Sequence, residues 1–236
     1  WKPSDNAVLS NYLFYEIMLE AGLPEGVLNF CPMNPEAFLD VVTKHKELSL
    51  LLFTGSSKVL DNIYEKVGSN IKNYNNFPRI VGESGGKNFH FLGKFNNNIN
   101  DNLENVVQKT IESSFNYSGQ KCSASSIVYV PENYLNFFVE KICKNVDKYI
   151  EKLDNYGLIN NVSFFKTQKL INELENDSKV DIVYRGKIDN LNSYYIEPNI
   201  FLCRDHNHKL FNEEFFAPVL TIYPYKKEEM LETVKL

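Results

Sequence analysis

Apolar residues recur at helical spacing in several segments of the chain, and short apolar runs lie between those segments. Most of the runs are bounded by glycine, proline or asparagine, which is typical of strand ends. The predicted helices are 4–22, 35–43, 59–67, 103–115, 134–150 and 163–177. The predicted strands are 27–30, 48–53, 79–83, 88–92, 126–130, 180–184, 194–197 and 219–223. Alternation of strands and helices indicates an α/β fold with a parallel sheet.

The run 48–53 is apolar throughout, as in a strand that is buried on both faces. The asparagine-rich stretch 95–102 is expected to be a loop without chemistry. Gly85 and Gly86 mark the expected domain boundary. Both ends look cut, because 1–3 resembles the end of a strand and 230–236 stops within an amphipathic pattern. The chain is therefore expected to be a fragment, and a missing targeting segment says nothing about location.

Composition excludes several classes of function. With 236 residues, 43% of them hydrophobic, the chain can bury a large core. A net charge of -5 argues against a nucleic-acid partner, and 48–53 is too short to cross a membrane. Cys31, Cys122, Cys143 and Cys203 have neither disulfide nor metal-ligand spacing, so free thiols in a reducing compartment are expected.

Cys122 is the candidate nucleophile. It lies in the polar stretch Gly-Gln-Lys-Cys-Ser just after an amphipathic segment, where Lys121 and backbone N–H groups favour a thiolate. The alternative is a small buried apolar residue, which is what most single cysteines are. Cys143 fits that alternative, because its neighbours follow an apolar helix face.

Glu83 is the candidate general base. The carboxylate lies in Gly-Glu-Ser-Gly-Gly-Lys, and glycines let a ligand approach the backbone closely. A solvated residue at the end of a strand is the alternative. We expect Glu83 and Cys122 to meet, because a thiolate with a carboxylate that activates water can oxidise or hydrolyse an acyl group.

Two further turns are ambiguous. The sequence Phe-Thr-Gly-Ser-Ser at 53–57 leads from a strand into a helix, so it is either a pyrophosphate seat or only a helix cap. The stretch 213–216 is either a charged turn with two core aromatics or a turn that contacts a cofactor. The four histidines lack a convergent set of ligands, so no metal is predicted, and His206 and His208 are expected in a loop.

Ordered motifs over nearly the whole chain resemble the aldehyde dehydrogenase superfamily. They are Ala-Gly-Leu-Pro-Glu-Gly-Val-Leu-Asn at 21–29, Phe-Thr-Gly-Ser at 53–56, Glu-Ser-Gly-Gly-Lys at 83–87, Gly-Gln-Lys-Cys at 119–122 and Glu-Glu-Phe-Phe-Ala-Pro-Val at 213–219. Within it, 1–5, 77–79, 85–91 and 120–124 resemble the 1-pyrroline-5-carboxylate dehydrogenase family. That resemblance implies NAD-dependent oxidation of glutamate semialdehyde to glutamate in proline catabolism, in the mitochondrial matrix.

The resemblance implies a role for each matching residue. Cys122 is the nucleophile and one oxyanion donor, Glu83 activates water, and Ser123 helps bind the substrate carboxylate. Lys2 and Asp5 hold the adenosine ribose, with the acid favouring NAD+ over NADP+. The implied pyrophosphate and adenine contacts are Gly55, Ser56, Ser57, Lys58 and Val59, and the implied nicotinamide-ribose contacts are Glu214 and Phe216. Ala217 replaces a usual glycine.

Taken together, we expect a Rossmann-like NAD-binding part over 1–84, an α/β catalytic domain over 85–224, and a returning segment over 225–236. The full-length enzyme is expected to be a homodimer, and the 236 residues alone are expected to be inactive. The resemblance implies that the family's oxyanion asparagine lies upstream of Trp1 and that the rest of the substrate anchor, beside Ser123, lies beyond Leu236. The alternatives are another NAD(P)-dependent aldehyde dehydrogenase, or an inactive truncated paralogue with a binding role.

Overall fold

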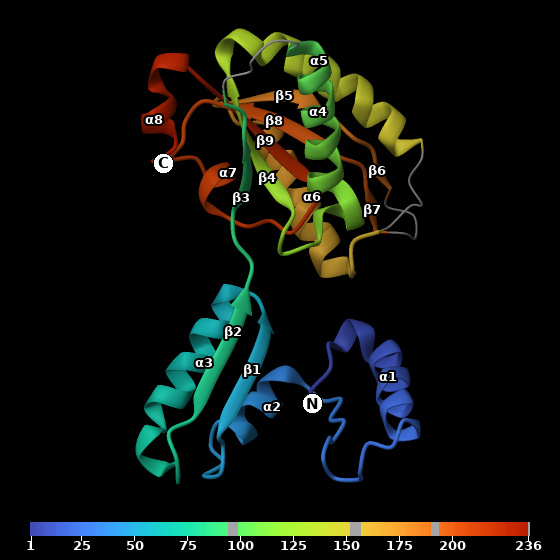
Figure 1. Cartoon of the computed structure of the whole chain (residues 1–236), viewed down its shortest axis with the longest axis vertical. Helices are drawn as coiled ribbons and strands as arrows, with labels where there is room; N and C mark the ends of the chain where they lie inside the picture. Colours follow the sequence, from blue (N-terminus) through green and yellow to red (C-terminus); the bar gives the residue numbers. More distant parts are fainter. Residues whose placement is uncertain (94–98, 152–156, 190–193, 236) are drawn as a thin grey trace. The chain divides into compact units, whose positions relative to one another are not determined.

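The computed structural model describes residues 1–93, 99–151, 157–189 and 194–235, and it divides between Ser84 and Gly85 into two units (Figure 1). The first unit is Trp1–Ser84 and the second is Gly85–Leu236. Each has its own parallel strands, so the predicted α/β class with parallel sheets is confirmed. The functions assigned to 1–84, 85–224 and 225–236 stay predictions.

The first unit begins with a short 3-10 turn, η1 (Asp5–Ala7), that leads into helix α1 (Val8–Glu20). The predicted helix is confirmed, and the chain turns away two residues after its end, at Gly22, whose φ of 96° suits glycine. The predicted strand 27–30 is wrong. Those residues form a turn and irregular backbone, and their neighbour is Trp1, whose carbonyl accepts from the Cys31 N–H at 2.9 Å.

Two parallel strands, β1 (Leu50–Gly55) and β2 (Arg79–Ser84), carry one part of the candidate site. Helix α3 (Ser57–Ser69) connects them and packs closely, since a Cβ on Gly82 would lie 2.4 Å from a methyl carbon of Leu60. The expectation that the first strand is buried on both faces is wrong. Leu52 is 75% exposed, so the residues that the structure describes leave one apolar face of this two-stranded sheet uncovered.

Helix α2 (Pro35–Val42) precedes these strands, and Asn34 caps it by accepting from two backbone N–H groups. Its end is fixed to the segment after α3. The carbonyl of Thr43 accepts from the amide of Asn70 at 2.9 Å and from the hydroxyl of Tyr74, which follows η2 (Ile71–Asn73). These bonds satisfy a carbonyl that the helix itself leaves without a partner.

The second unit contains a five-stranded sheet in the order β3-β4-β9-β8-β5. Its strands are β3 (Asn88–Phe91), β4 (Ser125–Pro131), β9 (Val219–Tyr225), β8 (Asn199–Cys203) and β5 (Val180–Tyr184). The first four run parallel, and β5 is antiparallel to β8. The strands predicted at β3, β4, β5 and β9 are confirmed.

Three details of the second unit differ from expectation. The internal strand β8, between β9 and β5, was not predicted. The strand predicted over 194–197 is shorter, since β7 (Tyr195–Ile196) pairs only with β6 (Ile188–Asp189). The asparagine-rich stretch expected as a loop enters helix α4 (Ile99–Phe115) from Ile99, and residues 95–98 of that prediction lie outside the described residues.

Helices cover both faces of this sheet (Figure 1). On one face α4 and α5 (Glu132–Ile150) bury Phe115, Phe138 and Ile142 against β4, β8 and β9. On the other, α6 (Asn161–Glu175) and α7 (Lys209–Asn212) bury Ile171 and Leu210. The chain continues into η4 (Lys227–Glu229) and α8 (Met230–Thr233). In the described ranges, no helix combines the length and apolarity needed to cross a membrane.

Candidate active site

Cys122 lies in an exposed turn between helix α4 and strand β4. The turn follows η3 (Asn116–Gly119), in which Tyr117, Ser118 and Gly119 have φ angles of 54°, 57° and 69°. Left-handed backbone at two non-glycine residues costs of order 1–2 kcal/mol each and is common at functional sites. The predicted position of Cys122, just past an amphipathic helix and outside the core, is therefore what the structure has.

Gly119 brings this turn against the stretch 213–219, nearly a hundred residues further along the chain. A Cβ on Gly119 would lie 2.4 Å from the carbonyl oxygen of Ala217 and 3.0 Å from that of Ser114. Only glycine fits both this approach and the positive φ. A small cavity of about 20 Å³ lies here, lined by residues that include Lys121 and Glu214.

The stretch 213–219 brings the predicted cofactor residues Glu214 and Phe216 to the same place. A Cβ on Gly85 would lie 2.0 Å from a carboxylate oxygen of Glu214, so this carboxylate rests directly on the glycine pair that follows Glu83. Phe216 is half exposed and has a φ of 52°. An exposed aromatic ring on a strained backbone is better suited to a ligand contact than to the core.

Lys87 completes this group of residues. Its ammonium lies 4.4 Å from the centroid of the Phe215 ring. Burial lowers the pKa of Lys87 to about 8, and the charges of Glu214 and Glu213 oppose that shift only in part. The second unit thus gathers the glycine pair, the Cys122 turn and Glu214, together with Ser123, which is exposed beside Cys122.

The remaining predicted residues lie in the first unit. Gly55 ends β1, and Ser56 caps α3 by accepting from the backbone N–H of Val59 at 3.4 Å. The first turn of α3 holds no acidic side chain, so its positive dipole is not neutralised locally. Ser57 is bonded through its hydroxyl to that of Ser84 at 3.1 Å, and Lys58 follows it in the exposed first turn.

Glu83 lies on β2 directly opposite Thr54 and is exposed, so it shares the carboxyl end of the parallel strands with the turn at Gly55. The carboxyl ends of parallel strands are where ligands of open α/β sheets bind. Lys2 and Asp5 form an ion pair at 3.0 Å. Because Glu83 and Cys122 belong to different units, their expected meeting stays a prediction.

Two of the other thiols, Cys143 and Cys203, are less exposed than Cys122. All four cysteines are free. Cys203 is buried, and Cys143 is partly buried beside Val183, whose carbonyl accepts from its thiol at 3.5 Å. Burial raises the pKa of both thiols, which disfavours the thiolate. Among the residues that the structure describes, no cluster of His, Cys, Asp and Glu is suited to hold a metal ion.

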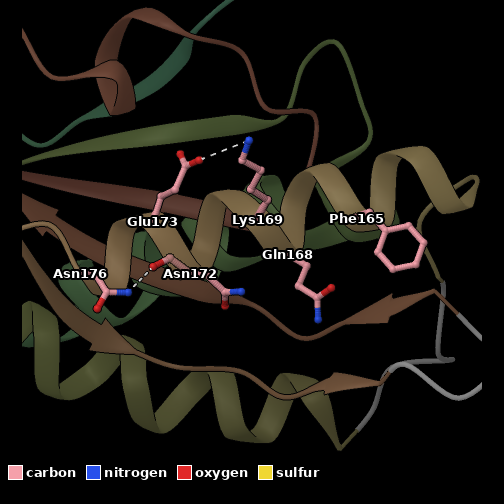
Figure 2. Close-up of a pocket in the computed structure, with 6 residues that line it drawn as sticks. All are labelled: Phe165, Gln168, Lys169, Asn172, Glu173 and Asn176. Carbon is pink, nitrogen blue, oxygen red and sulfur yellow. Dashed lines mark hydrogen bonds and ion pairs between the residues drawn. The ribbon is translucent and has the colours of Figure 1, made fainter.

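A surface hollow of about 580 Å³ along α6 contains none of the predicted site residues (Figure 2). Its side chains all come from one side of this helix. They are Phe165, Gln168, Lys169, Asn172, Glu173 and Asn176. Glu173 is paired with Lys209 at 2.6 Å and with Lys169 at 3.9 Å. With its carboxylate paired and no nucleophile present, we assign this hollow no chemistry.

Comparison with known proteins identifies the family of the chain. The aldehyde dehydrogenase family profile matches residues 1–234, so the chain belongs to the aldehyde dehydrogenase family. The expected family is confirmed.

Two relatives show which members of this family the chain resembles. The chain is 37% identical over 244 residues to a mitochondrial delta-1-pyrroline-5-carboxylate dehydrogenase of Dictyostelium discoideum, covering 100% of this chain and 43% of that protein. It is 34% identical over 243 residues to the human mitochondrial protein of the same name, again covering 100% of this chain and 42% of the relative. The chain thus spans less than half the length of these relatives.

The solved structures that the chain resembles also include 1-pyrroline-5-carboxylate dehydrogenases. The delta-pyrroline-5-carboxylate dehydrogenase of Mycobacterium tuberculosis matches with a TM-score of 0.85 and 28% identity, over 99% of this chain and 43% of that one. A Thermus 1-pyrroline-5-carboxylate dehydrogenase with bound NAD matches with a TM-score of 0.86 and 26% identity, over 98% of this chain and 45% of that one. These matches confirm the α/β fold expected from the resemblance.

Proposed function

We propose that the full-length protein oxidises L-glutamate 5-semialdehyde to L-glutamate with NAD+, as a 1-pyrroline-5-carboxylate dehydrogenase in proline catabolism. The observation that carries this proposal is the similarity of the whole chain to proteins of that name. The exposed Cys122 turn, packed against the stretch that carries Glu214, supports the chemistry.

In this proposal Cys122 is the nucleophile. Its thiolate adds to the aldehyde carbon and gives a thiohemiacetal, whose oxyanion accepts a hydrogen bond from the Cys122 backbone N–H. NAD+, when bound, would supply the hydride acceptor. Loss of hydride from that carbon leaves a thioester on the Cys122 sulfur. Glu83 then takes a proton from the water that hydrolyses the thioester, and glutamate leaves while the thiol is restored.

The residues of the chain fit NAD+. The turn at Gly55 and Ser56 and the unneutralised N-terminus of α3 suit a pyrophosphate. Lys2 and Asp5 would hold the adenosine ribose, where the acid disfavours a 2'-phosphate. Glu214 would hold the nicotinamide ribose, with the exposed ring of Phe216 beside it.

A substrate panel tests the proposal on the full-length protein. We expect NADH formation from glutamate semialdehyde to exceed that from succinate semialdehyde and from simple aliphatic aldehydes, because only the first has an α-amino acid head for Ser123 and its neighbours to bind. Preference for another aldehyde would instead identify a different aldehyde dehydrogenase.

Thiol labelling separates an active enzyme from an inactive paralogue. Iodoacetamide should modify Cys122 faster than Cys143 or Cys203 in the folded protein, since the first is exposed and burial raises the pKa of the other two. Equal rates for the three thiols would remove the basis for a nucleophilic role.

Location and assembly of the full-length protein are further parts of the proposal. We propose the mitochondrial matrix, because the Dictyostelium and human relatives are named mitochondrial. We also propose a homodimer. Fractionation of cells and light scattering on the purified full-length protein test these two points; a cytosolic pool alone, or a monomer, would contradict them.

A further inference from the structure

Asn88 joins the start of strand β3 to the Cys122 turn. Its side-chain amide donates to the carbonyl oxygen of Cys122 at 2.6 Å and to that of Ala124 at 3.2 Å. Both partners are carbonyl oxygens, which only accept, so the nitrogen end of the Asn88 amide must face them.

The strand ladder is irregular at this point, which explains why a side chain is needed. Asn88 pairs with Ser125, but Phe89 pairs with Ile127, so the register shifts between the two and Ser126 is passed over. The Ser126 hydroxyl donates to the backbone carbonyl of Asn88 at 3.3 Å. Asn88 therefore holds the entry to β4 from both its backbone and its side chain.

Among the described residues, other bonds hold the turn at Ala124 and Ser125. The Ala124 N–H donates to the carbonyl of Lys121 at 3.0 Å, and the Ser125 N–H donates to the hydroxyl of Ser113 at 3.3 Å. Neither bond involves the carbonyl of Cys122. A fixed carbonyl at Cys122 restricts rotation about its ψ angle, and with it the direction of the peptide that joins Cys122 to Ser123.

We propose that Asn88 is a positioning residue for the nucleophile, one that fixes the backbone of Cys122 through the two carbonyl bonds. The inference rests on the proposed function, because it assumes that Cys122 is the nucleophile. It also links the nucleophile turn to the segment 85–87, which rests against Glu214 through Gly85.

Asn88→Asp tests the inference with nearly unchanged shape. It replaces two N–H donors by a carboxylate oxygen that faces two carbonyl oxygens, and it puts a negative charge against the backbone of Cys122. We expect the second-order rate of iodoacetamide labelling at Cys122 to fall about tenfold at pH 8 and its pH profile to move upward, as a like charge disfavours the thiolate. Labelling of Cys143 in the same sample should not change.

The conservative variant Asn88→Ser and the control Asn105→Asp complete the test. Serine has one donor, so it should recover part of the labelling rate, while Asn105 is exposed on α4 and adds the same charge away from the turn. In the full-length enzyme, Asn88→Asp should lower kcat about tenfold and leave the KM for NAD+ unchanged, since orientation is lost only at the reacting sulfur.

The results separate the inference from the function on which it rests. Wild-type labelling of Cys122 in both Asn88 variants would overturn the positioning role. If labelling changes as expected but Cys122→Ala retains full activity, the proposed function fails while the contact between Asn88 and the turn stands. Faster labelling of Cys143 in Asn88→Asp would mean general unfolding, because unfolding exposes this partly buried thiol, and it would also overturn a specific role.

Discussion

The α-carbon of Gly119 rests against the carbonyl oxygen of Ala217, so that a Cβ added there would lie 2.4 Å from the oxygen. The obstacle is backbone rather than a flexible side chain, and the φ of 69° adds strain for any other residue. This contact fixes the turn that carries Cys122 to the stretch that carries Glu214.

Gly119→Ala should therefore be costly. We expect the free energy of unfolding to fall by about 2 kcal/mol or more, from the left-handed backbone and the displaced carbonyl together. Urea unfolding measures this. Gly93→Ala is the control, because no atom of the described residues lies within 4 Å of its added Cβ and its φ is not positive. Equal stability of the two variants would contradict the contact.

Gly85→Ala should affect cofactor binding rather than stability. The new methyl group would displace the Glu214 carboxylate, which is the far end of a flexible side chain and can move at little cost to the fold. We expect the KM for NAD+ to rise about tenfold with a small change in melting temperature. Gly86→Ala should have a smaller effect, since its Cβ would meet only the Asn88 side chain at 4.0 Å. An unchanged KM in Gly85→Ala would argue against the role of Glu214.

Lys87 should make stability depend on pH in the alkaline range. Burial lowers its pKa to about 8 from the model-compound 10.5, so between these values the unfolded chain holds a proton that the folded chain has released. The contribution of Lys87 to stability should then rise with pH across this window, by at most about 1.4 kcal/mol per pH unit.

Lys87→Met should remove that rise, as measured by urea unfolding from pH 7 to 10. Lys169→Met is the matched control, because the Lys169 side chain is 80% exposed on α6 (Figure 2). A rise of the same slope in Lys87→Met and in the wild type would show that another group causes it.

Sequence pattern predicted most elements because helix periodicity survives packing. The helix face through Val107, Ile111 and Phe115 is buried as expected. Strand β8 was missed because Pro198 and Asn199 at its start read as a turn. The strand predicted at 27–30 failed because a β-like run needs a ladder partner, and the described contacts of this run are with Trp1 and with the α1 side chains Tyr12 and Tyr15.

The residues of the candidate site also differ in how clearly the sequence indicated them. Cys122 and Glu83 carry a local signal, in that reactive side chains stand among small and polar residues. Asn88 and Lys87 carry none, because their roles depend on Cys122, Ala124 and Phe215, which are distant in the chain. In the sequence both residues simply follow the Gly85–Gly86 pair, and only the tertiary contacts show what they touch.

The central claim is that the sulfur of Cys122 and the carboxylate of Glu83 act in succession on one aldehyde. Rapid-mixing measurement of NADH in full-length Glu83→Gln tests it most directly, with Cys122→Ser alongside. The account predicts a burst of about one NADH per active site and then a stall in Glu83→Gln, because the thioester forms but is not hydrolysed, and no burst in Cys122→Ser. Steady turnover in either variant at the wild-type rate would contradict the account.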